Sequence, residues 1–161
     1  MENINPDVII EKVKDLIQSN IYDVNNTRRS KKGKWVHTDF PRLDAQTPRI
    51  SVFIVSAPAD GVGIGTFQRR QVLRFQVSIF VKSINSFRSP TEPNKMWNAE
   101  RVANYLSNEI VQLINGNAEL IGLGAKEPVF VDETLNNVNE MVQRNLDFEC
   151  WVRRDSLVNE D

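Results

Sequence analysis

The feature that most constrains the fold is a run of alternating apolar and polar residues, "FQRRQVLRFQVSIFVKS" (67–83). Because successive residues of a strand point to opposite faces of a sheet, a period of two predicts one long strand with a single buried face. A sheet built on such a strand needs a covering layer on that face alone. The apolar positions are Leu73, Phe75, Val77, Ile79 and Val81, and the mostly polar positions are Arg70, Val72, Arg74, Gln76 and Ser78.

Three further segments have the character of strands. "RISVFIVS" (49–56) is apolar on much of both faces, and "PVFVDE" (128–133) is a short apolar run. "MVQRNLDFECWVRRD" (141–155) alternates again and predicts a closing strand with one apolar face. That face carries Val142, Leu146, Phe148, Cys150 and Val152, and the opposite face carries Gln143, Asn145, Asp147 and Glu149.

Two segments have the spacing of amphipathic helices. Asn5 and Pro6 suit the cap and the first position of a helix over 5–20, whose apolar face is Ile9, Val13, Leu16 and Ile17. A second helix is predicted over 95–115, with Gly116 placed to end it. Its apolar stripe is Ala99, Ala103, Leu106, Ile110, Leu113 and Ile114.

These elements follow the order α–β–β–α–β–β and predict an α+β fold. We expect a mostly antiparallel sheet of about four to five strands with two helices packed on one face. A length of 161 residues favours a single domain over 1–161. Its predicted parts are a helix (5–20), a basic arm or loop (25–48) with a short strand around Trp35 and Val36, a long hairpin (49–83), a Pro-rich connection (88–97), a helix (95–115), a glycine-containing turn (115–128), strands (128–154) and a polar tail (155–161).

The stretch "PADGVGIGTFQRRQ" (58–71) raises the question of a phosphate cradle, because three glycines precede two arginines. A dinucleotide or P-loop cradle requires a helix after the glycines, since the helix N-terminus supplies amide donors. Here a strand follows, and the spacing is G-x-G-x-G without a G-K-[ST]. We therefore interpret the segment as the turn of a β-hairpin and expect no nucleotide or other cofactor.

Catalytic residue types are scarce. His37 is the only histidine, and Cys150, the only cysteine, lies on the apolar face of the last strand, where a buried and inert thiol is expected. Asp147 and Glu149 share one strand face about 7 Å apart and could hold a metal, but an exposed polar face explains them better. We expect a non-enzymatic protein; an enzyme with a carboxylate-held metal is the alternative.

The chain carries neither a long apolar run nor an N-terminal signal peptide, so we expect folding or assembly in a reducing cytoplasm. The net charge of −1 conceals an asymmetry: residues 1–88 carry 14 Lys and Arg against 8 Asp and Glu, whereas residues 89–161 carry 6 against 13. If the two halves occupy opposite flanks, copies can attract one another head to tail. The alternative is that both halves are solvated faces.

Two basic segments are candidate contact surfaces. The arm "RRSKKGKW", with Arg28, Arg29, Lys31, Lys32 and Lys34, has the charge and the aromatic neighbour of single-stranded nucleic-acid sites. It predicts a phosphate contact or a tether to an acidic neighbour, and a solvated mobile loop is the alternative. Arg69, Arg70 and Arg74, with Lys82 and Arg88, form a second basic strip. Arg70 and Arg74 share a strand face and could pair with Asp147 and Glu149 of a neighbouring copy and so close a ring.

The layout resembles the tail terminator and tail-completion proteins of long-tailed bacteriophages, which join head to tail. The matching segments span about residues 5–153, and their motifs are weak ones. They are "TPRISVFIV" (47–55), "DGVGIGTFQRRQVLRFQVSIFV" (60–81), "NAERVANYLSNEIVQLI" (98–114) and "VQRNLDFECWV" (142–152).

The resemblance implies a mixed sheet flanked by helices and a structural virion protein that forms a hexameric ring on the tail tube. Such a ring stops tube polymerisation, offers a surface to the head-side connector or stopper protein, and lets genomic DNA pass through its lumen without sequence-specific binding. It implies a place in the tail or neck of the virion after assembly in the host cytoplasm, with no membrane. Subunit contacts are then expected at Arg69, Arg70 and Arg74 and in the arm from Arg28 to Lys34.

Two alternatives stay open beside this one. The first is another neck component, a stopper or head-completion protein. The second is a small nucleic-acid-binding protein that uses the basic arm, whose affinity would fall steeply with salt. The acidic second half and the sequence pI of about 5.9 speak against the second alternative.

Overall fold

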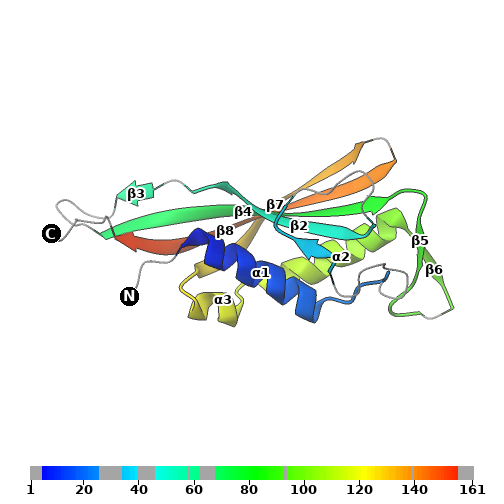
Figure 1. Cartoon of the computed structure of the whole chain (residues 1–161), viewed down its shortest axis with the longest axis horizontal. Helices are drawn as coiled ribbons and strands as arrows, with labels where there is room; N and C mark the ends of the chain where they lie inside the picture. The colour runs from blue at the N-terminus through cyan, green and yellow to red at the C-terminus, as the bar shows by residue number, and fades with distance from the viewer. Residues whose placement is uncertain are drawn as a thin grey trace.

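A computed structural model describes residues 5–25, 34–39, 46–57, 59–61, 68–92, 94–138 and 140–155 (Figure 1). The helices are α1 (Pro6–Asn20), α2 (Ala99–Ile114) and α3 (Ala118–Gly122). The strands are β1 (Val36–His37), β2 (Arg49–Ser56), β3 (Ala59–Gly61), β4 (Gln68–Lys82), β5 (Ser86–Arg88), β6 (Met96–Asn98), β7 (Lys126–Val138) and β8 (Met141–Asp155). None of the helices within these residues is long and apolar enough to cross a membrane.

The described strands form one six-stranded sheet and one small hairpin. The large sheet has the order β1-β2-β4-β8-β7, and β3 continues the line of β2 beside β4. Its pairings are antiparallel except for β1 with β2. The small hairpin joins β5 to β6. The predicted α+β class with a mostly antiparallel sheet is therefore confirmed.

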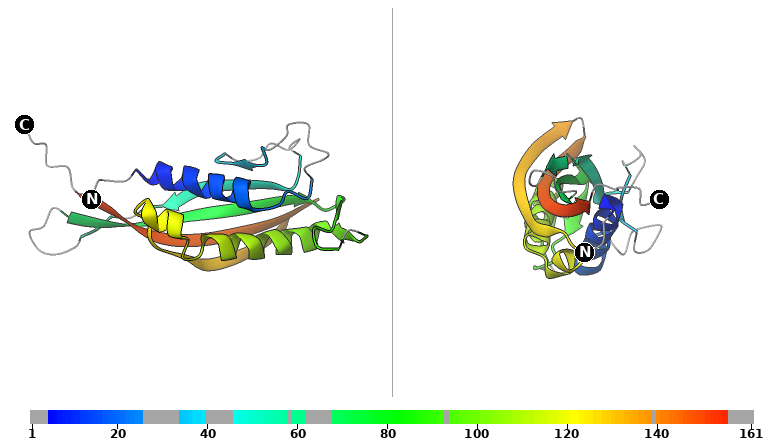
Figure 2. Two further views of the ribbon diagram at one scale, coloured as in Figure 1. Left: turned by 90° about the horizontal axis from the view of Figure 1, so that it is seen from below. Right: turned by 90° about the vertical axis from the view of Figure 1, so that its left-hand side faces the viewer.

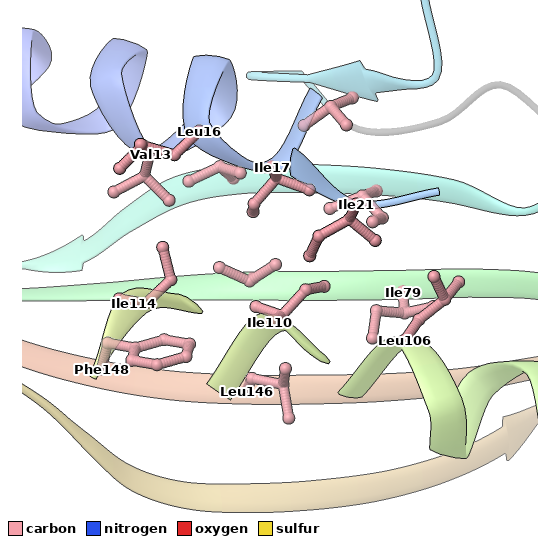
Figure 3. Packing of buried hydrophobic residues seen from close by; sticks show 14 of the residues in the cluster. Val13, Leu16, Ile17, Ile21, Ile79, Leu106, Ile110, Ile114, Leu146 and Phe148 are labelled. Carbon is pink, nitrogen blue, oxygen red and sulfur yellow. The ribbon is translucent and has the colours of Figure 1, made fainter. Parts of the chain in front are cut away.

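The helices lie together on one side of the large sheet, as Figure 2 shows, and the core fills the space between them. Every residue predicted on the apolar face of β4, from Leu73 to Val81, is at most 1 % exposed. In Figure 3, Val13, Leu16 and Ile17 of α1 and Ile110 of α2 point toward the strands of the large sheet. The alternation of the sequence thus placed the core correctly on a single face of the sheet.

The cap predicted at Asn5 and the glycine predicted after the second helix are confirmed, and Asn98 caps the start of α2, which was not predicted. Asn5 Oδ1 accepts a hydrogen bond from the Asp7 amide at 3.0 Å, and Asn98 Oδ1 accepts one from the Arg101 amide at 2.9 Å. An asparagine cap of this kind stabilises a helix by about 1 kcal/mol relative to alanine. Gly116 follows the end of α2 with a φ of +67°, a left-handed conformation that glycine adopts without strain.

The predicted hairpin around the glycines is present in the described residues. β3 pairs with β4 in antiparallel register, with Gly61 opposite Arg69. A register shift between Ile54 and Ser56 marks a bulge at the end of β2. The remaining two glycines, at 63 and 65, lie outside the described residues.

Four local predictions were wrong. The turn predicted at 115–128 contains α3, and the connection predicted at 88–97 includes the end of β5 and the start of β6. The helix predicted from residue 95 begins at Ala99, because Met96–Asn98 pair with β5 instead. The short strand predicted at 128–133 runs over Lys126–Val138, because pairing with β8 extends it in both directions.

Candidate interaction surfaces

The face of the sheet opposite the helices carries a ladder of polar side chains across β4 and β8. In three successive pairs along this face, the β4 residue donates a hydrogen bond to the residue directly opposite it in the register. Directly opposed polar pairs contribute to sheet stability, so this ladder supports the central strand pair. The pairs are Arg74 Nε with Glu149 Oε2 at 3.2 Å, Gln76 Nε2 with Asp147 Oδ1 at 3.0 Å, and Ser78 Oγ with Asn145 Oδ1 at 2.8 Å.

The ladder bears on two sequence predictions. Asp147 and Glu149, considered both as metal ligands and as contacts for a neighbouring copy, are held by Gln76 and Arg74 of their own chain. Among the residues that the structure describes, no group of three or more His, Cys, Asp or Glu side chains could hold a metal ion. Pairing of Arg74 with Glu149 of another copy stays a prediction.

The structure describes only some of the other predicted contact residues. Arg28, Arg29, Lys31 and Lys32 lie outside the described residues. Lys34 is exposed just before β1, where its carbonyl oxygen lies 3.2 Å from His37 Nε2. His37, at the edge of the sheet, thus contacts the backbone of a neighbouring residue, which is a structural role.

Arg69 and Arg70 lie on β4 in a part of the sheet that extends past the helices. Here β3, residues 68–71 of β4 and residues 152–155 of β8 form a three-stranded projection, which we call the arginine tongue. Figures 1 and 2 show it reaching beyond α1 and α3 at the end where β3 lies. It carries four arginines and two aspartates.

The register aligns the charged residues of the tongue across its strands. Arg69 lies across from Arg154, and Arg70 lies across from Arg153. On its other side, Arg70 lies across from Asp60 of β3, so the register places both signs of charge beside this residue. Arg153 and Arg154 were not among the predicted contact residues. Their signal was the third Arg-Arg doublet of the sequence, but only the register shows that it lies opposite Arg69 and Arg70.

The opposite edge of the sheet is the strand β7. It is the last strand of the order, so its outer side has no strand partner among the described residues. Val129, Val131 and Leu135 on β7 are 44, 55 and 62 % exposed. Asp132 and Glu133 are exposed between them and take part in no ion pair within the described part of the chain. We call these five residues the acidic edge.

Cys150 is buried in the apolar face of β8, as predicted. Desolvation by burial, with a smaller contribution from the charge of Glu149, raises the pKa of its thiol to about 12. Since the thiolate is the nucleophile, a thiol in this environment is inert at neutral pH.

Comparison with known proteins finds a likeness of structure but not of sequence. No protein-family model matches the chain, and no curated protein matches it. Among solved structures, the fold is similar to a chain from the "Virion of native gene transfer agent (GTA) particle", with a TM-score of 0.57 and 12 % sequence identity. The match covers 88 % of this chain and 92 % of that one. The likeness is one of fold.

The extent of that match includes more than the central sheet. At 88 % of the chain, it takes in helices as well as strands, and little of the other chain lies outside it. The two chains therefore share a whole arrangement and not a single supersecondary motif. At 12 % identity the shared arrangement transfers no residue roles.

Proposed function

We propose that this chain is a structural protein of a phage-like virion. The observation that carries the proposal is the nearly full-length likeness of fold to a chain of a gene transfer agent particle. The uneven charge along the sequence supports it: residues 1–88 carry 14 Lys and Arg against 8 Asp and Glu, whereas residues 89–161 carry 6 against 13. Such an asymmetry suits contacts between copies in an assembly.

Within a virion we propose the role of tail terminator. Copies form a hexameric ring that caps the tail tube, stops its polymerisation and joins it to the head-side connector, with DNA passing through the lumen. This finer role rests on the resemblance of layout. The tongue supports it, because a projection beyond the helical layer can reach a neighbouring subunit or the tube. Lys34, Arg69, Arg70 and Arg74 stay predicted subunit contacts.

We further propose that the chain acts through contacts and not through catalysis. Asp147 and Glu149, the carboxylates that a metal-dependent reaction would use, are occupied in the polar ladder. Cys150 is buried. Within the described residues, strand edges and charged side chains are therefore the features that can make contacts in an assembly.

Removal of the gene from a particle-producing strain tests the role. A terminator limits tube growth, so its loss should yield tubes of uncontrolled length without heads, as measured by negative-stain electron microscopy. A stopper or head-completion protein should instead leave tails of normal length that fail to join heads. Complementation with the wild-type gene is the control. Particles of normal length and infectivity without the protein would refute both roles.

A further inference from the structure

The second half of β7 is an open edge of the large sheet. Its pairing with β8 runs from Asp132 to Val138 without a register shift, and residues 131–137 are all exposed. The outer side of the strand has no strand partner within the described part of the chain. This regular run therefore presents its outward backbone N–H and C=O groups, which are the groups that a further strand would pair with.

The first half of β7 is protected against such pairing, and the second half is not. Pro128 has no N–H to donate, and register shifts occur between Lys126 and Val129 and between Phe130 and Asp132. Prolines and bulges of this kind keep edge strands from pairing with other chains. Residues 132–138 contain no proline and no register shift. They are therefore the part of β7 that can accept another strand.

The charge along this edge is entirely negative. Residues 127–143 include no lysine or arginine and four exposed carboxylates, which belong to Glu127, Asp132, Glu133 and Glu140. None of the four takes part in an ion pair within the described residues. Arg144 of β8 lies opposite Leu135, but its guanidinium donates to Asn104 of α2. A strand that pairs with this edge must therefore bring positive charge to it.

We propose that residues 132–138 of β7 bind an extended, basic segment of a different protein as an additional antiparallel strand. Backbone hydrogen bonds supply the affinity of such a contact, and the side chains supply its specificity. Basic residues of the segment lie opposite Asp132 and Glu133, and an apolar residue lies opposite Leu135, which is 62 % exposed. Along the segment, the apolar residue therefore precedes two consecutive basic residues by two and three positions.

A different protein fits this edge better than a second copy of the chain does. Pairing of two β7 edges would bring the carboxylates of both copies into one ladder, where like charges repel. The other described edges are too short to match residues 132–138, since β1 has two residues and β3, β5 and β6 have three each. On β1, moreover, the Val36 amide already donates to Gln18 Oε1 at 3.3 Å. The contact is thus additional to the subunit contacts proposed above and does not depend on the terminator role.

Titration of the full chain with a synthetic peptide tests the contact, with backbone amide shifts in NMR spectra as the readout. The probe is a short capped peptide in which leucine stands two positions before a pair of lysines and threonine fills the other positions. We expect saturable shifts and slower hydrogen exchange for the amides of residues 132–138. Replacement of both lysines by glutamate should weaken binding about tenfold or more, because two attractive contacts become repulsive.

Two controls separate strand pairing from a general attraction of charge. A peptide with the same side chains and N-methylated backbone amides keeps its charge but cannot pair as a strand, so it should not bind. The variant Asp132→Asn with Glu133→Gln should weaken binding of the lysine peptide. Glu11→Gln with Asp15→Asn removes the same charge from side chains of α1 that are 53 and 66 % exposed, and it should bind as wild type does. The peptide controls use the wild-type chain and keep the test valid if a variant does not fold.

Several outcomes would overturn the inference. These are an absence of shifts in β7 at millimolar peptide, equal binding of the N-methylated peptide, or equal weakening by the α1 variant. Shifts of the β7 amides with protein concentration alone would show that a second copy covers this edge instead. The tail-length measurement after gene removal is independent of these results, so failure of the peptide to bind leaves the terminator role intact.

Discussion

Arg144 of β8 crosses the apolar face of the sheet to reach Asn104 of α2, with Nη2 donating to Oδ1 at 3.1 Å. Its side chain is 4 % exposed, and its Nη2 also lies 3.7 Å from Glu100 Oε1, on a carboxylate that is 60 % exposed. Arg144 Nε has no hydrogen-bond partner in the described part of the chain. The guanidinium thus depends on few partners, and Asn104 is the one that holds it at hydrogen-bond distance.

Asn104→Ala is expected to lower the free energy of unfolding by about 1–3 kcal/mol, because it leaves a buried charged donor unsatisfied. Asn108→Ala, at an exposed position of the same helix, is the matched control, since it has the same gain in helix propensity. Urea denaturation measures both. Equal stabilities for the two variants would mean that Arg144 finds another partner without cost.

Phe148 lies at the centre of an aromatic cluster, and its truncation should be among the most costly single changes. Its ring stacks on Phe75 with centroids 5.4 Å apart and contacts Phe130 edge-on at 5.8 Å. Phe148→Ala should cost about 3–5 kcal/mol of unfolding free energy, and Phe148→Leu clearly less, because less of the cavity is left empty. Ile84→Ala, at a side chain that is 77 % exposed, is the control and should change stability little.

The fold was predictable where burial imposes a period on the sequence. β4 and β8 each place one face against the helices, so their alternation could be recognised, and α1 combined a cap with an apolar stripe. The second half of β7 carries no such signal. Residues 131–137 are exposed, and only pairing with β8 makes them a strand. α3 is one short helical turn, and its N-cap, Asn117, lies in a glycine-containing segment that was interpreted as a turn.

The candidate surfaces were predictable only in part, because they depend on register. Arg69, Arg70 and Arg74 stood out as charge in a strand, but alternation cannot show which residues lie opposite them. The pairing of β4 with β8 places Arg154 opposite Arg69 and Glu149 opposite Arg74. If the register of β4 and β8 were shifted by one residue, Glu149 would no longer lie opposite Arg74, and the attraction between these two side chains would be lost.

Cys150 should resist labelling in the native state. With its pKa raised to about 12 by burial, only about one thiol in ten thousand is a thiolate at pH 8. We expect iodoacetamide to modify wild type only as fast as it unfolds. Ile84→Cys in a Cys150→Ala background supplies an exposed thiol and should react at the rate of a free peptide. Wild-type labelling at that same rate would show that β8 opens readily.

The raised pKa of the Cys150 thiol also predicts a decline in stability at alkaline pH. An unperturbed cysteine thiol has a pKa of 9.0, and burial raises this value in the native state, so above pH 9 the unfolded chain loses its proton first. The native state then binds more protons than the unfolded state, and the free energy of unfolding falls as pH rises from 9 towards 12. Burial also raises the pKa of Tyr105, which acts in the same direction. Cys150→Ala should make the decline shallower, as urea denaturation across this range would measure. An unchanged slope would contradict the assignment.

Arg74 and Glu149 offer a test of whether the polar ladder serves one chain or two. Their side chains are 58 and 26 % exposed at a separation of 3.2 Å, and exposed pairs of this kind contribute about 0.2–1 kcal/mol. A double-mutant cycle with Arg74→Gln and Glu149→Gln should give a coupling in this range at concentrations where the chain is monomeric, and salt should weaken it. The pair Lys95 and Glu92, at 3.0 Å within one loop, provides a control outside the polar ladder. A coupling that appears only as copies associate would instead support the predicted contact between subunits, and the ladder would then be completed by a neighbour.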